Sequence, residues 1–163
     1  MASLGELGDK RAVTPLVEVL TDQNKYVREE AVNALGVLQD KKAVDALIAA
    51  LQDKDWGVRW GAANALGELR DKKAVAALIS ALKDETRYVR EGAALTLSRI
   101  GKHAVPALIE GLADKDRNIR RWAAWTLGKI KDERAARHLI GALNDEDGGV
   151  QFAAEVALAE MEE

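Results

Sequence analysis

The chain has 163 residues, of which 48% are apolar and 31% are charged, and its formal net charge is −3. This length is within the range of a single domain, and the apolar content is sufficient for a continuous core. There is no cysteine, which excludes disulfides and thiolate metal sites. The finely mixed charge argues against a dedicated nucleic-acid protein. No apolar run approaches the roughly 18 residues of a membrane span, so we expect a cytoplasmic protein with no membrane partner.

One four-residue phrase, Leu-Gly-x-Leu or a close variant, recurs along the chain. It stands at Leu35–Leu38, Leu66–Leu69, Leu97–Ile100 and Leu127–Ile130, with eroded copies at Leu4–Leu7 and Leu158–Met161. The period is 31 residues, except for 30 between Leu97 and Leu127, where one residue is missing near Gly101. A fixed period of this size is typical of repeat proteins, in which each repeat buries its apolar face against its neighbours.

Each repeat is predicted to hold two helices. In the repeat 40–69, the apolar residues of the first half fall on one helical stripe, and so do those of the second half. Asp55 precedes the second half, and its column in the other repeats holds Asn24, Thr86, Asp116 and Asp147, all residue types that cap helices. The predicted helices are 11–21, 25–38, 42–52, 56–69, 73–83, 87–100, 103–113, 117–130, 134–143 and 148–161.

The predicted fold is therefore all-α, an α-solenoid that forms a single repeat domain over residues 1–163. It comprises a partial repeat at 1–8 and five full repeats at about 9–38, 40–69, 71–100, 101–130 and 132–161. The second helices carry a column of small residues at Gly36, Gly67 and Gly128, which predicts a close approach of neighbouring helices.

An acidic and a basic residue recur six positions apart in four of the repeats. A guanidinium can bond a turn carboxylate and backbone carbonyls together, so we interpret these residues as a structural ladder that ties repeats to one another. The pairs are Asp22 with Arg28, Asp53 with Arg59, Asp84 with Arg90, and Asp114 with Arg120.

The repeats resemble a known family. Segments such as Leu66-Gly-Glu-Leu-Arg-Asp-Lys-Lys-Ala-Val are similar to HEAT-like repeats of the phycobilisome-lyase type and to the artificial α-helical repeat binders derived from them. The resemblance covers nearly the whole chain. It implies a right-handed superhelix whose second helices line the concave side, and it is compatible with scaffolds, bilin lyases and regulatory domains.

The aromatic residues are confined to one side of the second helices. On a helical wheel, the near-constant columns and the variable columns occupy nearly complementary sectors, and every aromatic residue falls in the variable sector. Aromatic residues usually supply much of the buried core area, so their placement on the variable face suggests a binding surface. The candidate partner-binding residues are Trp56, Trp60, Tyr88, Arg117, Arg121, Trp122, Trp125 and Phe152.

The function predicted from these features is a non-catalytic scaffold that binds a protein or peptide on its concave face, without a cofactor or metal. His103 and His138 lie in different columns, and the chain has no cysteine nucleophile or phosphate loop. Two alternatives stay open, namely a bilin-lyase-like pigment chaperone and nucleic-acid binding through the basic fourth repeat. Because neither end of the chain carries the polar substitutions of a cap, we expect either that the chain is a segment of a longer array or that it self-associates end to end.

Overall fold

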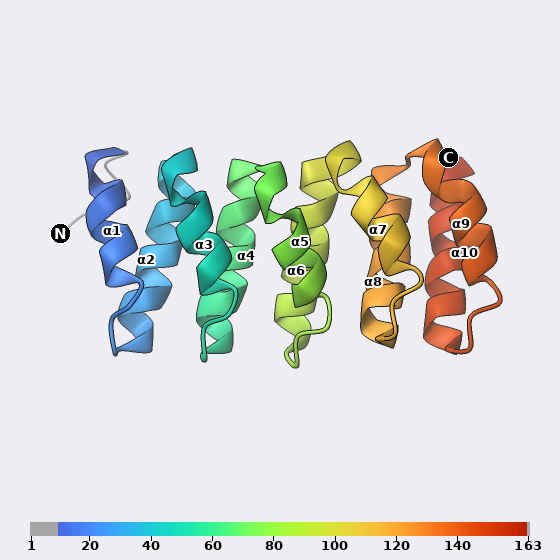
Figure 1. The fold of residues 1–163 in the computed structure, drawn as a ribbon, viewed down its shortest axis with the longest axis horizontal. Helices are drawn as coiled ribbons and strands as arrows, with labels where there is room; N and C mark the ends of the chain where they lie inside the picture. Colours follow the sequence, from blue (N-terminus) through green and yellow to red (C-terminus); the bar gives the residue numbers. More distant parts are fainter. Residues whose placement is uncertain (1–9, 163) are drawn as a thin grey trace. The chain divides into compact units, whose positions relative to one another are not determined.

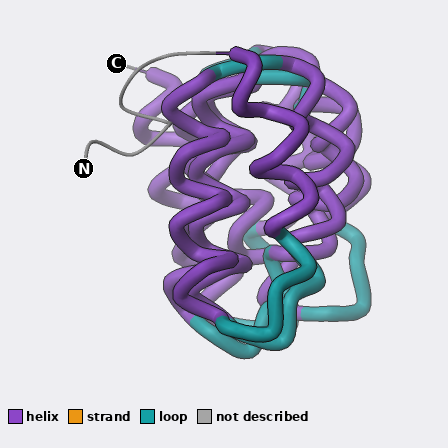
Figure 2. Tube along the Cα trace, turned by 90° about the vertical axis from the view of Figure 1, so that its left-hand side faces the viewer, coloured by secondary structure: helices purple, strands orange, loops and turns teal. Residues whose placement is uncertain are grey.

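Helices are the only regular structure in the part of the chain that the structure describes, residues 10–162 (Figures 1 and 2). The structure is a computed structural model. The chain forms two compact bodies, the first at residues 1–74 and the second at residues 75–163. The eroded phrase at Leu4–Leu7, expected to belong to a preceding helix, lies outside the described residues.

The first body contains the first two repeats and the opening turn of the third. The second helices α2 and α4 pack side by side, and each first helix packs on the second helix of its own repeat (Figure 1). The elements are η1 (Lys10–Ala12), α1 (Val13–Val19), α2 (Lys25–Leu38), η2 (Lys41–Ala43), α3 (Val44–Ala50), α4 (Trp56–Leu69) and η3 (Lys72–Ala74).

The second body repeats this arrangement with three helix pairs. The second helices α6, α8 and α10 form one layer, and α5, α7 and α9 form the other (Figure 1). The elements are α5 (Val75–Ala81), α6 (Arg87–Ile100), η4 (Gly101–His103), α7 (Val105–Gly111), α8 (Arg117–Ile130), η5 (Glu133–Ala135), α9 (Ala136–Ala142) and α10 (Gly148–Glu162).

The second helices begin and end where the sequence predicts, apart from one added residue at the end of α10. The first helices are shorter than predicted. In the second repeat the expected helix 42–52 is a 3₁₀ turn followed by an α-helix of seven residues. Asp40 caps that 3₁₀ turn through the Lys42 N–H, and i→i+3 bonds from Gln52 and Asp53 tighten the other end.

The caps of the second helices follow the predicted column with one exception. Asn24, Asp55, Asp116 and Asp147 each accept a hydrogen bond from the backbone N–H two residues later. Thr86 makes no such side-chain bond, although its backbone has the same extended conformation.

The core between the two layers is aliphatic. Leu35 and Leu66 in the first body, and Leu97 and Leu127 in the second, are fully buried. All are members of the repeating phrase, and within residues 10–162 no aromatic residue is buried with them. A core of this composition leaves the aromatic residues available for other contacts.

Neighbouring second helices approach so closely that a side chain would not fit at the glycine column. A Cβ built on Gly36 would lie 3.0 Å from the Ala65 Cβ, and one on Gly128 would lie 2.6 Å from the Ala157 Cα. The second distance is to backbone, which cannot move aside as a side-chain tip can. The glycines therefore fix the spacing of α2 against α4 and of α8 against α10.

The missing residue of the 31-residue period lies at Gly101. After α2, α4 and α8 the chain makes its turn with two residues, a left-handed one (Gln39, Arg70 or Lys131) and then an aspartate. After α6, Gly101 alone replaces both, with φ 71° and ψ −134°, and it also begins η4. This combination of dihedral angles is one that glycine adopts far more readily than any other residue.

Arginines join consecutive repeats within each body, but the carboxylate comes from the following repeat. Arg28 donates to the carbonyl oxygen of Asp22, as the six-residue spacing allows, and its fork donates to both carboxylate oxygens of Asp53 at 2.7 and 2.8 Å. The Asp22 carboxylate instead accepts from the N–H of Asn24. Arg59 likewise donates to the carbonyl oxygen of Asp53. The predicted pairs six apart thus bond through the backbone carbonyl, whereas the carboxylate of Asp53 binds the arginine of the preceding repeat.

The same fork recurs at Arg120 but not at Arg90. Arg120 donates to the carbonyl oxygen of Asp114 and to both carboxylate oxygens of Asp145, at 2.8 and 3.0 Å. Arg90 donates to the carbonyl oxygen of Asp84, yet no carboxylate of the described residues lies within 4.0 Å of its guanidinium, and its buried Nε has no acceptor there. The expected partner is Asp114, which follows the shortened turn. We attribute the lost link to that deletion.

The turn at Gly101 gives a first test. Gly101→Ala should destabilise the protein by about 1–3 kcal/mol, because its backbone conformation is strained for any residue with a Cβ. The space around the site is open, so steric contact adds nothing. Gly141→Ala is the matched control, since Gly141 is also uncrowded but lies inside α9. That change should stabilise by about 0.5–1 kcal/mol. Urea unfolding of both variants measures the difference, and equal midpoints would contradict it.

The interrupted ladder gives a second test. Asp145→Ala should cost about 3 kcal/mol, because the buried Arg120 loses the carboxylate that binds its fork and keeps only the exposed Glu146. Asp114→Ala should cost only about 1 kcal/mol, because it removes a turn bond to the Asp116 N–H and no ion pair. Asp145 makes the equivalent turn bond to Asp147, so the comparison isolates the arginine contact. The interpretation fails if both variants unfold at the same urea concentration.

The ladder also predicts a pH dependence. Burial raises the pKa of Asp53 and of Asp145, but hydrogen bonds from Arg28 or Arg120 and from the turn N–H outweigh it, so both pKa values lie below the ordinary one. Each ion pair therefore contributes its full stability above about pH 4, the ordinary pKa of aspartate, and loses it as the pH falls through the lowered pKa. Asp145→Ala should accordingly lose less stability than the wild type between about pH 5 and 2. Urea titrations across that range measure the effect, and parallel profiles would refute it.

Candidate functional site

The second body carries a groove across its layer of second helices. Its volume is about 590 Å³, within the range of about 300–1,000 Å³ of ligand sites. We call it the aromatic groove. The lining residues come from α6, α8 and α10, and they are Arg87, Arg121, Trp122, Trp125, Gly149, Phe152, Ala153 and Val156.

Two tryptophans on α8 form the wall of this groove. The Trp122 and Trp125 rings have centroids 5.6 Å apart and planes inclined by 78°, which is an edge-to-face arrangement. Both side chains are half-buried. Phe152, on α10, is 66% exposed although it is a large apolar side chain. The groove thus offers a partner a firm aromatic wall and one freely accessible ring.

The position of Trp122 follows from the small residues around it. Its column holds Gly92 on α6 and Ala153 on α10, and these two helices pack on either side of α8. Small side chains at both neighbouring positions leave volume that the indole can occupy. The same column carries Glu30 and Gly61 in the first body, so the wall is a feature of the fourth repeat and not of the repeat pattern.

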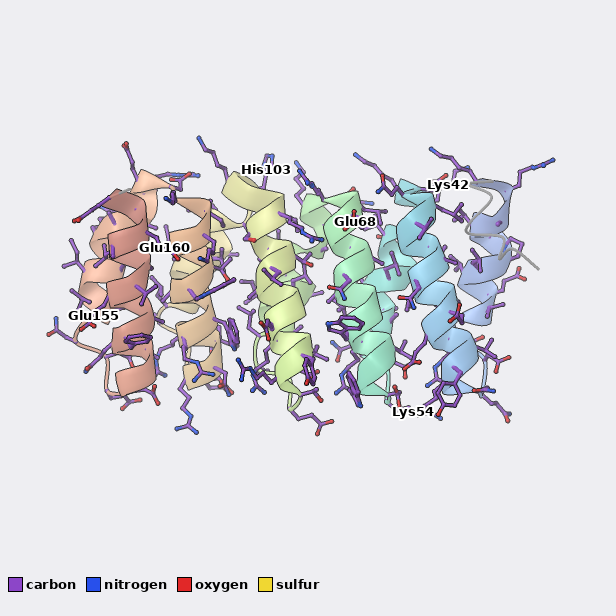
Figure 3. All side chains as sticks on the ribbon, turned by 180° about the vertical axis from the view of Figure 1, so that it is seen from behind. Lys42, Lys54, Glu68, His103, Glu155 and Glu160 are labelled. Carbon is purple, nitrogen blue, oxygen red and sulfur yellow. The ribbon has the colours of Figure 1, made fainter. Side chains whose placement is uncertain are left out.

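Cations stand over both rings. The Arg121 guanidinium carbon lies 5.9 Å from the Trp122 ring centroid, and Lys129 Nζ lies 5.4 Å from that of Trp125. These distances are within the range of cation–π attraction. Lys129 also donates to Glu160, which lies between α10 and α8 in Figure 3, whereas Glu155 extends from the opposite edge of α10. The charge on the groove itself is positive, because its lining includes two arginines and no carboxylate.

The eight predicted partner-binding residues are divided between the two bodies. Arg121, Trp122, Trp125 and Phe152 line the aromatic groove. Trp56 and Trp60 lie on α4 of the first body, 46% and 43% exposed.

The remaining two predicted residues lie on the second body but outside the groove. Tyr88 is exposed on α6. Arg117 faces Asp147 at 3.5 Å and lines a separate polar hollow of about 520 Å³ at the turns before α8 and α10.

The residues that sequence reasoning missed are Arg87, Gly149, Ala153 and Val156. All four lie in variable columns of the wheel, but only two have side chains whose chemistry suggests a contact. Arg87 shares its column with Arg117, and Val156 shares its column with Trp125, so both belong to the variable face. Gly149 and Ala153 carry no chemical signature. They form the floor because α10 presents small residues there, which only the packing of α8 against α10 reveals.

The first body has a hollow of a different character. It measures about 460 Å³, lies between α2 and α4, and contains none of the aromatic residues. Asn33 and Asn64 line it in equivalent columns, with Gly36 and Gly61 below. In the second body the same asparagine column holds Leu95, Trp125 and Val156. The two bodies therefore present different chemistry from one repeating framework.

Two kinds of site are not found in residues 10–162. No group of three or more histidine, aspartate or glutamate side chains is arranged to hold a metal ion there. In the same part of the chain, every helix is too short or too polar to cross a bilayer.

Solved structures with a similar fold include a lyase complex, an archaeal repeat protein and a designed repeat protein. A structure of the complex of CpcE and CpcF of phycocyanin lyase from Nostoc sp. PCC7120 is 30% identical, with a TM-score of 0.64, over 99% of this chain and 69% of that chain. An archaeal HEAT-like repeat protein from Thermococcus onnurineus NA1 is 18% identical, with a TM-score of 0.64, over 95% and 72%. A designed armadillo repeat protein in complex with the peptide (KR)4 is 20% identical, with a TM-score of 0.58, over 93% and 82%.

A search of the curated proteins finds no match. Two models of repeat families do match the chain. The model of the PBS lyase HEAT-like repeat matches residues 1–22. The model of HEAT repeats matches residues 13–98, 44–114 and 75–159, which together extend over most of the sequence. With its paired helices, aliphatic core and 31-residue period, the chain belongs to the family of HEAT-repeat proteins.

Proposed function

We propose that the chain is a non-catalytic scaffold and that the aromatic groove of the second body binds a peptide segment of a partner protein. The observation that carries the proposal is the exposure of Phe152 beside the two half-buried tryptophans. Trp, Tyr and Arg side chains are enriched among the residues that dominate binding energy in protein interfaces. A groove with tryptophan, arginine and phenylalanine side chains on three neighbouring helices can hold an extended segment along its length.

The core supports this proposal. The buried apolar residues of both layers are aliphatic and form the core without Phe152, so the folded state does not require that ring. Leaving a large apolar side chain in water has a free-energy cost that binding removes, at about 25 cal/mol per Å² of apolar surface buried. The exposed Trp56 and Trp60 on α4 have the same character and offer a second contact surface on the first body.

A pigment-chaperone role is the second candidate. The likeness to a phycocyanin lyase complex at 30% identity favours it, and an aromatic wall with arginines can also hold a planar anion. A visible-absorbance titration with a free bilin separates the two candidates. A scaffold for peptides leaves the pigment spectrum unchanged, whereas a pigment-binding protein shifts it saturably.

Selection from a random peptide library tests the main proposal. Short peptides displayed on phage are selected on the wild-type protein, and the affinities of recovered peptides are measured by calorimetry. Phe152→Ala should weaken binding by about 2 kcal/mol if the ring is a hot spot, and the exposed ring can be removed without loss of the fold. Trp125→Ala should do the same, with circular dichroism as a check on folding.

Ile140→Ala is the matched control. Ile140 is 56% exposed on α9, in the other layer of the same body, so its loss should leave the affinity unchanged. The proposal fails if the library yields no binding peptide, or if Ile140→Ala weakens binding as much as Phe152→Ala.

A further inference from the structure

The cations around the aromatic groove differ in how fully they are neutralised. Arg117 faces Asp147, Lys129 donates to Glu160, and Arg87 lies 3.9 Å from Glu91 on its own helix. Arg121 is different. Within residues 10–162, no carboxylate lies within 4.0 Å of its guanidinium and none of its N–H groups has an acceptor. One arginine in the groove wall therefore has its hydrogen-bonding capacity available to a ligand.

Arg121 is nevertheless held in place. A Cβ on Gly149 would lie 3.3 Å from the Arg121 Cδ and 3.7 Å from one of its terminal nitrogens, so the absence of a side chain at Gly149 makes room for this arginine. The guanidinium also rests over the Trp122 ring. Its neighbour Arg120, by contrast, uses its donors on Asp145, Glu146 and two backbone carbonyls. A positioned guanidinium with unused donors is suited to the fork-to-fork geometry of a carboxylate.

A second unused donor belongs to the neighbouring residue, Trp122. The indole Nε1 of Trp122 is buried and has no acceptor in the part of the chain that the structure describes. A buried donor without a partner is destabilising, and native proteins keep few of them. Arg121 and Trp122 both line the groove, so this donor belongs to the same wall as the unpaired guanidinium.

We propose that the aromatic groove selects acidic peptide segments, in which a glutamate or aspartate pairs with Arg121 and an adjacent bulky apolar side chain packs on Trp125 and Phe152. This proposal rests on the proposed function and specifies its ligand. Arg87, at the α6 rim of the groove, has only a long, exposed pair with Glu91 and is a weaker second positive charge for the same segment. The lining contributes no carboxylate that would repel it.

The pattern of neutralised cations favours a peptide over a nucleic acid. A phosphate backbone is bound by several lysines and arginines at once, each of which releases counterions. Around this groove Arg117 and Lys129 already have carboxylate partners, and the net charge of the chain is −3. One unpaired arginine beside an aromatic wall fits a single carboxylate with an apolar neighbour better than it fits a run of phosphates.

The test uses the same random library, and the recovered peptides are sequenced to determine their amino-acid composition. Peptides recovered on the wild type should be enriched in Glu and Asp next to large apolar residues. Arg121→Glu should reverse the preference to Lys and Arg, and Arg121→Gln should weaken a recovered acidic peptide at least about tenfold, since a charge-assisted bond is lost. Arg117→Gln is the matched control, because Arg117 lies on the same helix outside the groove lining, and it should leave that affinity within about twofold.

The indole donor supplies an independent readout. In ¹H–¹⁵N spectra of the wild type, the Trp122 indole N–H signal, assigned with Trp122→Phe, should shift when the acidic peptide is added, because Trp122 lines the groove. A variant of that peptide with Gln for every Glu should bind at least about tenfold more weakly.

The outcomes separate this inference from the proposed function. Peptides that bind without acidic enrichment, or that bind Arg121→Gln as well as the wild type, overturn the acidic specificity and leave peptide binding intact. A library that yields no peptide overturns both. Binding of an oligodeoxythymidine probe in place of any peptide, with affinity that falls steeply with salt, also overturns both and points to nucleic acid.

Discussion

The contact on which the rest of each body depends is the close packing of neighbouring second helices at the glycine column. At Gly36 and Gly128 the facing alanines leave no room for another carbon atom. Helices that approach this closely have their side chains in fixed register, so equivalent columns of adjacent repeats lie next to each other. The aromatic groove is a product of that register. Trp122 has space because small residues occupy its column on both sides, and Phe152 reaches the same hollow from α10.

The repeat framework also separates stability from recognition. Buried leucines and valines, capped helices and cross-repeat arginine forks stabilise the fold with residues that recur along the chain. The variable face contributes little to that set, so it can differ between bodies without loss of the fold. In the first body it carries an asparagine column, and in the second the same column is apolar. One framework thus supports two surfaces of different chemistry.

Most of the fold could be predicted from the sequence, because the same pattern of apolar and capping residues recurs in five repeats and indicates both the helices and their caps. The second helices were predicted to within one residue, whereas the first helices were predicted too long, since the pattern of apolar residues does not distinguish a 3₁₀ turn from an α-helical one. The aromatic half of the groove could be predicted from the wheel. Gly149 and Ala153 could not, because small residues on a floor have no chemical signature. The sequence also could not predict which carboxylate each arginine binds. An aspartate six residues before the arginine and an aspartate in the next repeat recur with the same period, so the pattern does not distinguish them.

The single residue missing at Gly101 has a consequence for how the second body unfolds. In a linear array each repeat is coupled only to its neighbours, and the coupling sets how far an opening spreads. Between α8 and α10 the coupling includes the Arg120 fork, whereas between α6 and α8 the equivalent arginine has no carboxylate among the described residues. We therefore expect the joint at Gly101 to be the boundary between two cooperative folding segments, residues 75–100 and 101–162. The groove spans that boundary, so a ligand that contacts both Arg87 and Arg121 would hold the two segments together in place of the missing ion pair.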